Sequence, residues 1–140
     1  MTISLPARRR VAAPGPRDEA LRRARVCYDH LAGDHGVQVL DALLRRKLLR
    51  RRDNELELTP AGVGFFRSFG IDLDALAAKR RPLCRTCLDW SVRRHHLGGA
   101  VGAELLQRLF ALGWAKRVKD SRVVTFTPGG EAALNRQFLS

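Results

Sequence analysis

The chain has 140 residues and a formal net charge of +12, because 26 lysines and arginines outnumber 14 acidic residues. Hydrophobic residues make up 45% of it, a share that is normal for a folded domain and excludes a disordered polypeptide. The charge favours an anionic partner, with nucleic acid ahead of an anionic membrane surface; a merely solvated arginine-rich surface is the alternative. No run of 18 apolar residues occurs, so we predict no membrane span.

The N-terminal segment, residues 1–17, holds three prolines and the basic run Arg8-Arg9-Arg10. It lacks the apolar stretch that a secretory signal needs, so we expect a flexible basic leader. The chain has three cysteines, and an odd number argues against a disulfide scaffold. Together these features favour the cytoplasm.

One stretch of the chain occurs twice. His30-Leu31-Ala32-Gly33-Asp34-His35-Gly36 returns as His96-Leu97-Gly98-Gly99-Ala100-Val101-Gly102, 66 positions later. Cys27-Tyr28-Asp29 precedes the first copy, as Cys87-Leu88-Asp89 precedes the second. A match of this kind indicates one folded unit used twice.

In the first unit, apolar residues at helical spacing predict a helix that begins near Asp18 and is stopped by Gly33. The next predicted elements are a short helix over 37–46, two strands over 48–51 and 55–59, and a helix that begins at Thr59-Pro60 and ends at Gly70. The order within the unit is therefore helix, turn, helix, hairpin, helix.

A short connecting helix is predicted over 72–81, and the second unit follows it. Leu83, Cys87 and Trp90 are expected to line one side of its first helix. The further predicted elements are a strongly apolar helix over 101–112, a hairpin with strands 114–118 and 123–127, and a closing helix from Thr127-Pro128 to about Phe138.

Several of these motifs resemble a known family. Leu48-Leu49-Arg50-Arg51 and Leu58-Thr59-Pro60-Ala61-Gly62 look like pieces of a bacterial winged helix-turn-helix domain. More narrowly, residues 27–33, and residues 87–91 with His96-Leu97-Gly98-Gly99, resemble the C-terminal region of ArsR-type transcriptional regulators. The resemblance covers roughly residues 20–138. Such regulators carry a DNA-reading winged helix ahead of this region, where this chain has the Pro-rich leader, and the cysteine box of their metal-sensing members is not evident.

This resemblance, with the repeat, implies a mainly α fold with two small β-hairpins (α+β). We expect two degenerate winged-helix units, packed in pseudo-twofold fashion in one compact domain. The predicted divisions are the leader 1–17, the first unit 18–71, the connecting helix 72–82 and the second unit 83–140.

Basic residues gather at the end of the predicted second helix and on the hairpin of each unit, where they are expected to contact DNA phosphates. These candidate DNA-binding residues are Arg45, Arg46, Lys47, Arg50, Arg51, Arg52, Arg108, Lys116, Arg117, Lys119 and Arg122. A solvated basic face, or a site for an acidic protein, is the alternative.

Thiols and imidazoles form a second candidate site. Cys84 and Cys87 have C-x-x-C spacing, and the repeat relates His30 to His96. With Cys27 these side chains are candidate ligands for zinc or another thiophilic metal. His30 lies three residues after Cys27, so helical geometry is expected to put these two on one side. The alternatives are core packing of the cysteines and, for each histidine, a hydrogen bond to a backbone carbonyl in the last turn of a helix.

The function predicted from the sequence is that of an ArsR-like, transcription-associated regulator that binds double-stranded DNA. No nucleophile motif, phosphate loop or paired-carboxylate spacing is present, so we predict that the protein is not an enzyme. The alternative is a sensor or interaction module without its own DNA reader, which binds a metal, a small effector or a protein. A homodimer and a separate reader-domain protein are the further partners considered.

Overall fold

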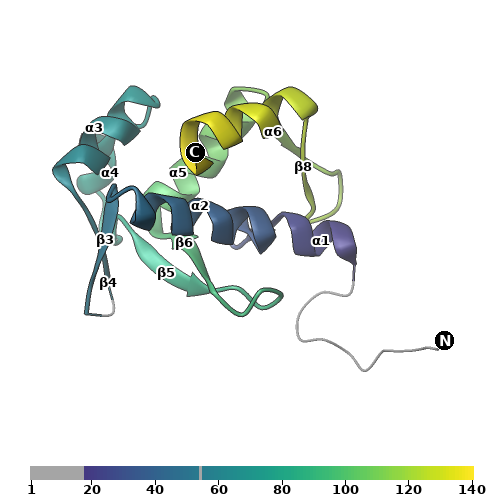
Figure 1. Ribbon diagram of the computed structural model, residues 1–140, viewed down its shortest axis with the longest axis horizontal. Coiled ribbons are helices and arrows are strands. Elements are labelled where there is room, and N and C mark those ends of the chain that lie inside the picture. Colours follow the sequence, from purple (N-terminus) through teal and green to yellow (C-terminus); the bar gives the residue numbers. More distant parts are fainter. Residues whose placement is uncertain (1–17, 54) are drawn as a thin grey trace.

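The structure is a computed structural model that describes residues 18–53 and 55–140, so the predicted leader lies outside the described residues. The first repeat contains α1 (Glu19–Arg23), β1 (Arg25–Cys27), β2 (His30–Ala32), α2 (Gly33–Arg45), β3 (Leu49–Arg52), β4 (Glu55–Leu58) and α3 (Pro60–Ser68). After α4 (Leu73–Ala77), the second repeat contains β5 (Arg85–Leu88), β6 (His95–Gly98), α5 (Gly99–Ala111), β7 (Ala115–Arg117), β8 (Val124–Phe126), α6 (Pro128–Leu134) and the π-helical turn η1 (Asn135–Leu139). Figure 1 shows their arrangement.

The predicted α+β class is confirmed, but the number of hairpins was wrong. Within the described residues there are four antiparallel two-stranded sheets instead of two. The helix expected to run from Asp18 to Gly33 ends at Arg23, because Ala24 is already extended and the chain turns back through β1 and β2. Gly33, with a φ of +84°, begins α2 rather than ending a helix.

The second repeat departs from the prediction in the same way. The expected first helix is the hairpin of β5 and β6, in which Cys87 pairs with His96. Trp90, predicted to line a packed helix, is 66% exposed in the loop of that hairpin. Short strands whose partners lie across a turn can carry apolar residues at a spacing that imitates a helix.

The repeats pack on each other reciprocally. Helix α2 of the first repeat lies against β6 of the second, and α5 lies against β2. A Cβ atom at Gly36 would lie 3.3 Å from the Cβ of His96, and one at Gly102 would lie 3.4 Å from the Cβ of His30. Glycine at these positions lets each helix approach the histidine strand of the other repeat. This arrangement agrees with the expected pseudo-twofold packing.

One hydrophobic core runs through both repeats. Leu40 and Leu43 of α2 are fully buried with Leu106 and Leu109 of α5, and the C-terminal Phe138 joins the same cluster. The helix predicted over 37–46 corresponds to α2, which begins earlier than expected, at Gly33, and ends at Arg45. It lies at the centre of the molecule (Figure 1).

Each repeat ends in a hairpin that leads into a helix, and we call these β3–β4 and β7–β8 pairs the wing hairpins. Thr59 and Thr127 cap the helices that follow, since their Oγ1 atoms accept hydrogen bonds from the amides of Gly62 (3.0 Å) and Gly130 (2.9 Å). In Figure 1, β3 and β4 lie at the left end of the molecule and β8 lies toward the right end. The two wing hairpins are therefore far apart.

The Thr59 cap supports a stability prediction. Replacing Thr59 by alanine removes the acceptor for the Gly62 amide, so we expect the free energy of unfolding to fall by about 1 kcal/mol. Urea unfolding followed by circular dichroism measures this change. Ser68→Ala, an exposed hydroxyl in the last turn of the same helix, is the control and should change stability by only a few tenths of a kcal/mol. Equal effects from both variants would contradict the assignment of the cap.

Candidate metal centre and basic surfaces

Two hairpins each place a cysteine directly opposite a histidine. In β1–β2 the paired residues are Cys27 and His30, and in β5–β6 they are Cys87 and His96. Directly opposite residues of an antiparallel pair project from the same face, with Cβ atoms about 4.5–5.5 Å apart. Each repeat thus presents one thiol and one imidazole as a unit.

The two Cys–His pairs meet where the repeats pack together. The Nε2 atoms of His30 and His96 lie 3.0 Å apart, and the Sγ atoms of Cys27 and Cys87 lie 4.0 Å apart. One candidate ligand atom from each of these four residues falls within 4.8 Å of every other. Both histidines are buried, whereas both cysteines are half-buried. We call these four residues the Cys2His2 cluster.

A carboxylate lies behind each histidine. The Nδ1 atom of His30 lies 3.2 Å from Oδ1 of Asp29, and the Nδ1 atom of His96 lies 3.1 Å from Oδ2 of Asp89. Asp29 also accepts a hydrogen bond from Arg81 at 2.8 Å. Each imidazole is therefore oriented by a carboxylate so that its other nitrogen points into the cluster.

The electrostatics of the cluster keep the histidines neutral and the aspartates ionised. Burial, followed by the nearby His30, lowers the pKa of His96 to about 4, although Asp89 acts in the opposite direction. Burial also lowers the pKa of His30. For Asp89, burial alone would raise the pKa, but hydrogen bonds from Ser91 and from two backbone amides outweigh it and lower the pKa to about 2.

The third cysteine is placed apart from this cluster. Cys84 was predicted with the metal ligands on its C-x-x-C spacing, but it is buried in the hydrophobic core and does not belong to the four-residue group. Burial raises the pKa of its thiol to about 12. The alternative of core packing therefore describes Cys84, whereas Cys27 and Cys87 are half-buried beside each other.

Two further expectations for the histidines were wrong. Helical geometry was expected to bring Cys27 and His30 together, but they face each other across a two-residue turn. The alternative role for His30 and His96, a bond to a backbone carbonyl at a helix end, is also not observed, because both lie on strands and contact carboxylates.

Many of the predicted DNA-binding arginines have partners within the protein. Arg45 and Arg46 donate to the carbonyls of residues 137–139 at the end of η1, and Arg46 also lies over the ring of Phe65. Arg50 and Arg52 pair with Glu57, and Arg108 donates to the carbonyl of Phe69. These contacts stabilise the fold and leave fewer cations for a partner.

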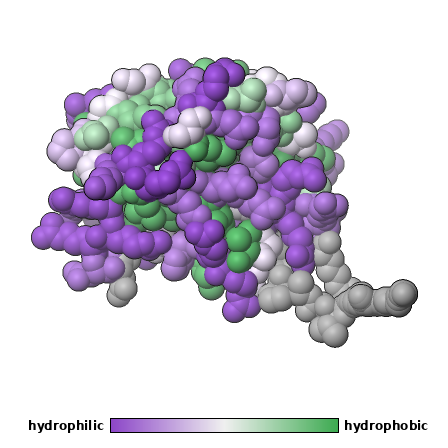
Figure 2. Space-filling model, in the orientation of Figure 1, coloured by the Kyte–Doolittle hydropathy of each residue, from purple (hydrophilic) through white to green (hydrophobic). Residues whose placement is uncertain are grey.

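Four other cations of the predicted set have no side-chain partner anywhere in residues 18–53 and 55–140: Lys47, Arg51, Lys116 and Lys119. All four are exposed and lie on or directly before a wing hairpin. In Figure 2 hydrophilic side chains cover the lower left of the visible face, where the β3–β4 wing hairpin lies.

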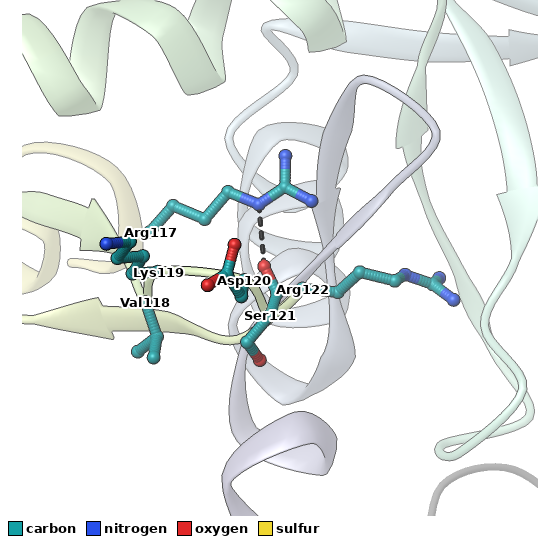
Figure 3. A pocket seen from close by; sticks show the side chains of 6 residues that line it. All are labelled: Arg117, Val118, Lys119, Asp120, Ser121 and Arg122. Atoms are coloured by element: carbon teal, nitrogen blue, oxygen red, sulfur yellow. Dashed lines mark hydrogen bonds between the residues drawn. The ribbon is translucent and has the colours of Figure 1, made fainter.

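The loop of the β7–β8 wing hairpin forms an open hollow lined by residues 117–122 (Figure 3). The Nε atom of Arg117 donates to the carbonyl of Ser121 at 2.8 Å, and the Nε atom of Arg122 donates to the carbonyl of Val26 at 3.0 Å. Each guanidinium is held through Nε, and in Figure 3 both side chains extend toward the right of the view, with their guanidinium groups at separate positions.

The helices that precede the wing hairpins are not exposed as reading helices would be. On α2 the exposed positions are Asp34, Gln38 and Arg45, and its other residues are buried or half-buried against β6 and η1. Asp41 of α2 pairs with Arg94. A helix with this surface offers acidic groups where a DNA-reading helix needs donors for phosphates and base edges.

Sequence reasoning did not single out the residues that support the cluster. Asp89 is fully buried, pairs with Arg25 at 3.4 Å and accepts a hydrogen bond from the amide of Gly33 at 2.5 Å. One signal was available, because an aspartate stands two positions after the cysteine in both copies, at Asp29 and Asp89.

These features define a class: a twofold-repeated α+β protein with two basic wing hairpins and a Cys2His2 cluster between its repeats. The chain is similar to a protein of Bacillus subtilis (strain 168) described as an uncharacterized HTH-type transcriptional regulator, YdfF, with 40% identity over 116 residues. The match covers 83% of this chain and 51% of that protein, so the chain spans about half the length of the curated relative it matches. No family model and no solved structure matches the chain. Among the described residues, none of the helices is long and apolar enough to cross a membrane.

Proposed function

We propose that this protein acts in transcription regulation as a DNA-binding protein of the ArsR-like type, and that its wing hairpins contact the phosphates of duplex DNA. The similarity to an HTH-type transcriptional regulator supports the regulatory role. The observation that carries the DNA contact is a set of exposed cations on or directly before the wing hairpins whose side chains have no partner among the described residues: Lys47, Arg51, Lys116 and Lys119.

Contacts of this kind supply affinity rather than sequence recognition. Phosphate contacts are the same at every base pair, whereas base reading requires side chains that enter a groove. Helices α2 and α5 lie against the opposite repeat, so the proposal assigns the wing hairpins, not these helices, to DNA.

A salt titration tests this proposal. We expect the full chain to bind a fluorescent duplex with an affinity that falls linearly on a plot of log K against log salt, with similar slopes for two unrelated sequences. The double variant Lys116→Gln, Lys119→Gln should weaken binding and reduce the slope by about 0.9 for each phosphate contact removed. Fluorescence anisotropy measures both quantities.

A charge-matched control tests whether the position of the lysines on the wing hairpin, rather than the total charge of the protein, determines binding. Lys79→Gln, Arg80→Gln removes the same two charges from the exposed segment after α4, outside both wing hairpins. The control should keep the wild-type slope. Binding that is weak and independent of salt, or an equal loss in both double variants, would overturn the proposed contacts.

A second function is favoured by the burial of α2 and α5. A protein whose reader-position helices are buried is suited to be a sensor or interaction module that acts with a separate DNA-reading domain, or as a homodimer. Failure of the full chain to bind duplex DNA at low salt would select this function over the first.

A further inference from the structure

We infer that Cys27, His30, Cys87 and His96 form a tetrahedral binding site for a divalent, thiophilic cation of the zinc class. Each repeat supplies one cysteine and one histidine, so the ion would lie at the junction of the repeats. This inference does not rest on DNA binding, because it uses none of the wing-hairpin residues.

The spacing of the four atoms fits a small tetrahedral ion. Zinc–sulfur bonds of about 2.3 Å and zinc–nitrogen bonds of about 2.0–2.1 Å place two sulfurs about 3.8 Å apart and two nitrogens about 3.3 Å apart at tetrahedral angles. The corresponding separations here are 4.0 Å between the sulfurs and 3.0 Å between the nitrogens. The sulfur–nitrogen separations are all within 4.8 Å and would have to close to about 3.6 Å, so side-chain shifts of up to about 1 Å would bring all four atoms to ligand distance.

The geometry of the histidine pair is compatible with a metal ion between its rings. Because each Nδ1 faces a carboxylate, the hydrogen of each neutral ring belongs on Nδ1, where it is donated to Asp29 or Asp89. Both Nε2 lone pairs then point at each other across 3.0 Å. Two acceptors at that distance repel each other unless a proton on one Nε2 or a cation lies between them, and a metal ion bound to both nitrogens removes the repulsion.

The sulfurs complete the charge balance. Two thiolates neutralise a divalent ion, which suits a site in which both histidines are buried. The sulfurs are half-buried, so an ion can enter from their side of the cluster. At 4.0 Å they are not joined by a disulfide, whose sulfur–sulfur bond is about 2.05 Å.

Metal titration of the full 140-residue chain tests this inference. Reduced protein, stripped with a chelator, should bind one Co²⁺ per chain and give the intense visible bands and thiolate-to-cobalt charge transfer of a tetrahedral S2N2 site. Zn²⁺ should displace the cobalt stoichiometrically and raise the midpoint of thermal unfolding, because an ion that binds the folded state stabilises it.

Matched variants identify the ligands. Cys27→Ser and Cys87→Ser should each lose the charge-transfer intensity of one sulfur and weaken Co²⁺ binding by more than the 10- to 100-fold loss typical of an outer-shell partner. Cys84→Ala and His95→Gln should bind like the wild type, since Cys84 lies in the core and His95 is exposed beside His96. Asp29→Asn, as a positioning residue, should weaken binding by about 10- to 100-fold while the visible bands stay tetrahedral.

Three results would overturn the inference. One is wild-type protein that binds less than one ion or gives the weak bands of octahedral Co²⁺. Another is a loss on Cys84→Ala as large as the loss on Cys27→Ser. The third is a Cys27–Cys87 disulfide that persists in reductant and leaves no thiol for metal. The wild-type spectrum decides the question even where a variant fails to fold.

Discussion

We expect Asp89→Asn to lower the free energy of unfolding by about 3–5 kcal/mol, the range found when one partner of a buried ion pair is removed. Asp89 is fully buried and is the counter-ion of Arg25, whose side chain is also buried. An asparagine of the same shape leaves the charge of Arg25 without a partner. The measurement is urea unfolding at neutral pH, in chelator, so that metal does not contribute.

The hydrogen bonds of Asp89 explain why an isosteric amide cannot replace it. One oxygen accepts from the Ser91 amide and hydroxyl, while the other accepts from the Gly33 amide and lies 3.1 Å from Nδ1 of His96. An asparagine carries two N–H donors on one side, so either orientation sets donors against donors. The substitution therefore affects the start of α2 in the first repeat and β6 in the second.

The repeat supplies a control for this prediction. Asp29 occupies the equivalent position, but its side chain is 30% exposed and its arginine partner is 39% exposed. Exposed pairs contribute little, so Asp29→Asn should cost less than about 1 kcal/mol. The prediction fails if Asp89→Asn is as stable as Asp29→Asn. Arg25→Met combined with Asp89→Asn should recover part of the loss, because it removes the unpaired buried charge.

Local sequence signals identified the second half of each repeat well. Strands over 48–51 and 55–59 were predicted, and the structure has Leu49–Arg52 and Glu55–Leu58. Thr59 and Thr127 were predicted to begin helices, and both side chains cap them. Turn residues, a threonine cap and a proline in the first turn act within a few residues, so the sequence alone reports them.

The first half of each repeat depends on contacts that no local pattern reveals. Strand β1 is held partly by the other repeat, since the amide of Val26 donates to the carbonyl of Arg122 and Arg25 pairs with Val123. A strand of three residues stabilised in this way looks like part of a helix when only its apolar spacing is read. Tertiary contacts decided its conformation.

The repeat nevertheless identified the residues that meet in the cluster. Aligning the two copies paired Cys27 with Cys87 and His30 with His96, and the structure brings these four together. The physical reason given was helical spacing, whereas the geometry comes from strand pairing. Cys84 was added on its C-x-x-C spacing, but it lies in a bend just before β5 and packs into the hydrophobic core. An internal repeat therefore predicted proximity better than a short motif did.

A second large effect is expected where α3 meets the wing hairpin. We predict that Gly62→Ala lowers the free energy of unfolding by about 3 kcal/mol, the upper end of the usual cost of overpacking. A Cβ at Gly62 would lie 1.8 Å from the carbonyl oxygen of Leu48. That carbonyl accepts a hydrogen bond from the amide of Thr59 at 3.2 Å, so it cannot move away without losing the bond that joins the hairpin to α3.

Gly64 lies in the same helix, but its replacement by alanine is expected to raise the free energy of unfolding rather than lower it. A Cβ at Gly64 meets no atom within 4 Å among the described residues, so Gly64→Ala should stabilise the protein by about 0.5–1 kcal/mol through helix propensity alone. Urea unfolding of the two variants measures both signs. The second repeat offers the same pair, because a Cβ at Gly130 would lie 2.0 Å from the carbonyl oxygen of Trp114, whereas one at Gly129 would have no described atom within 4 Å. If Gly62→Ala also stabilised the protein, the tight packing of α3 and α6 against the wing hairpins that precede them would be wrong. The cations on those hairpins would then not be held in fixed positions.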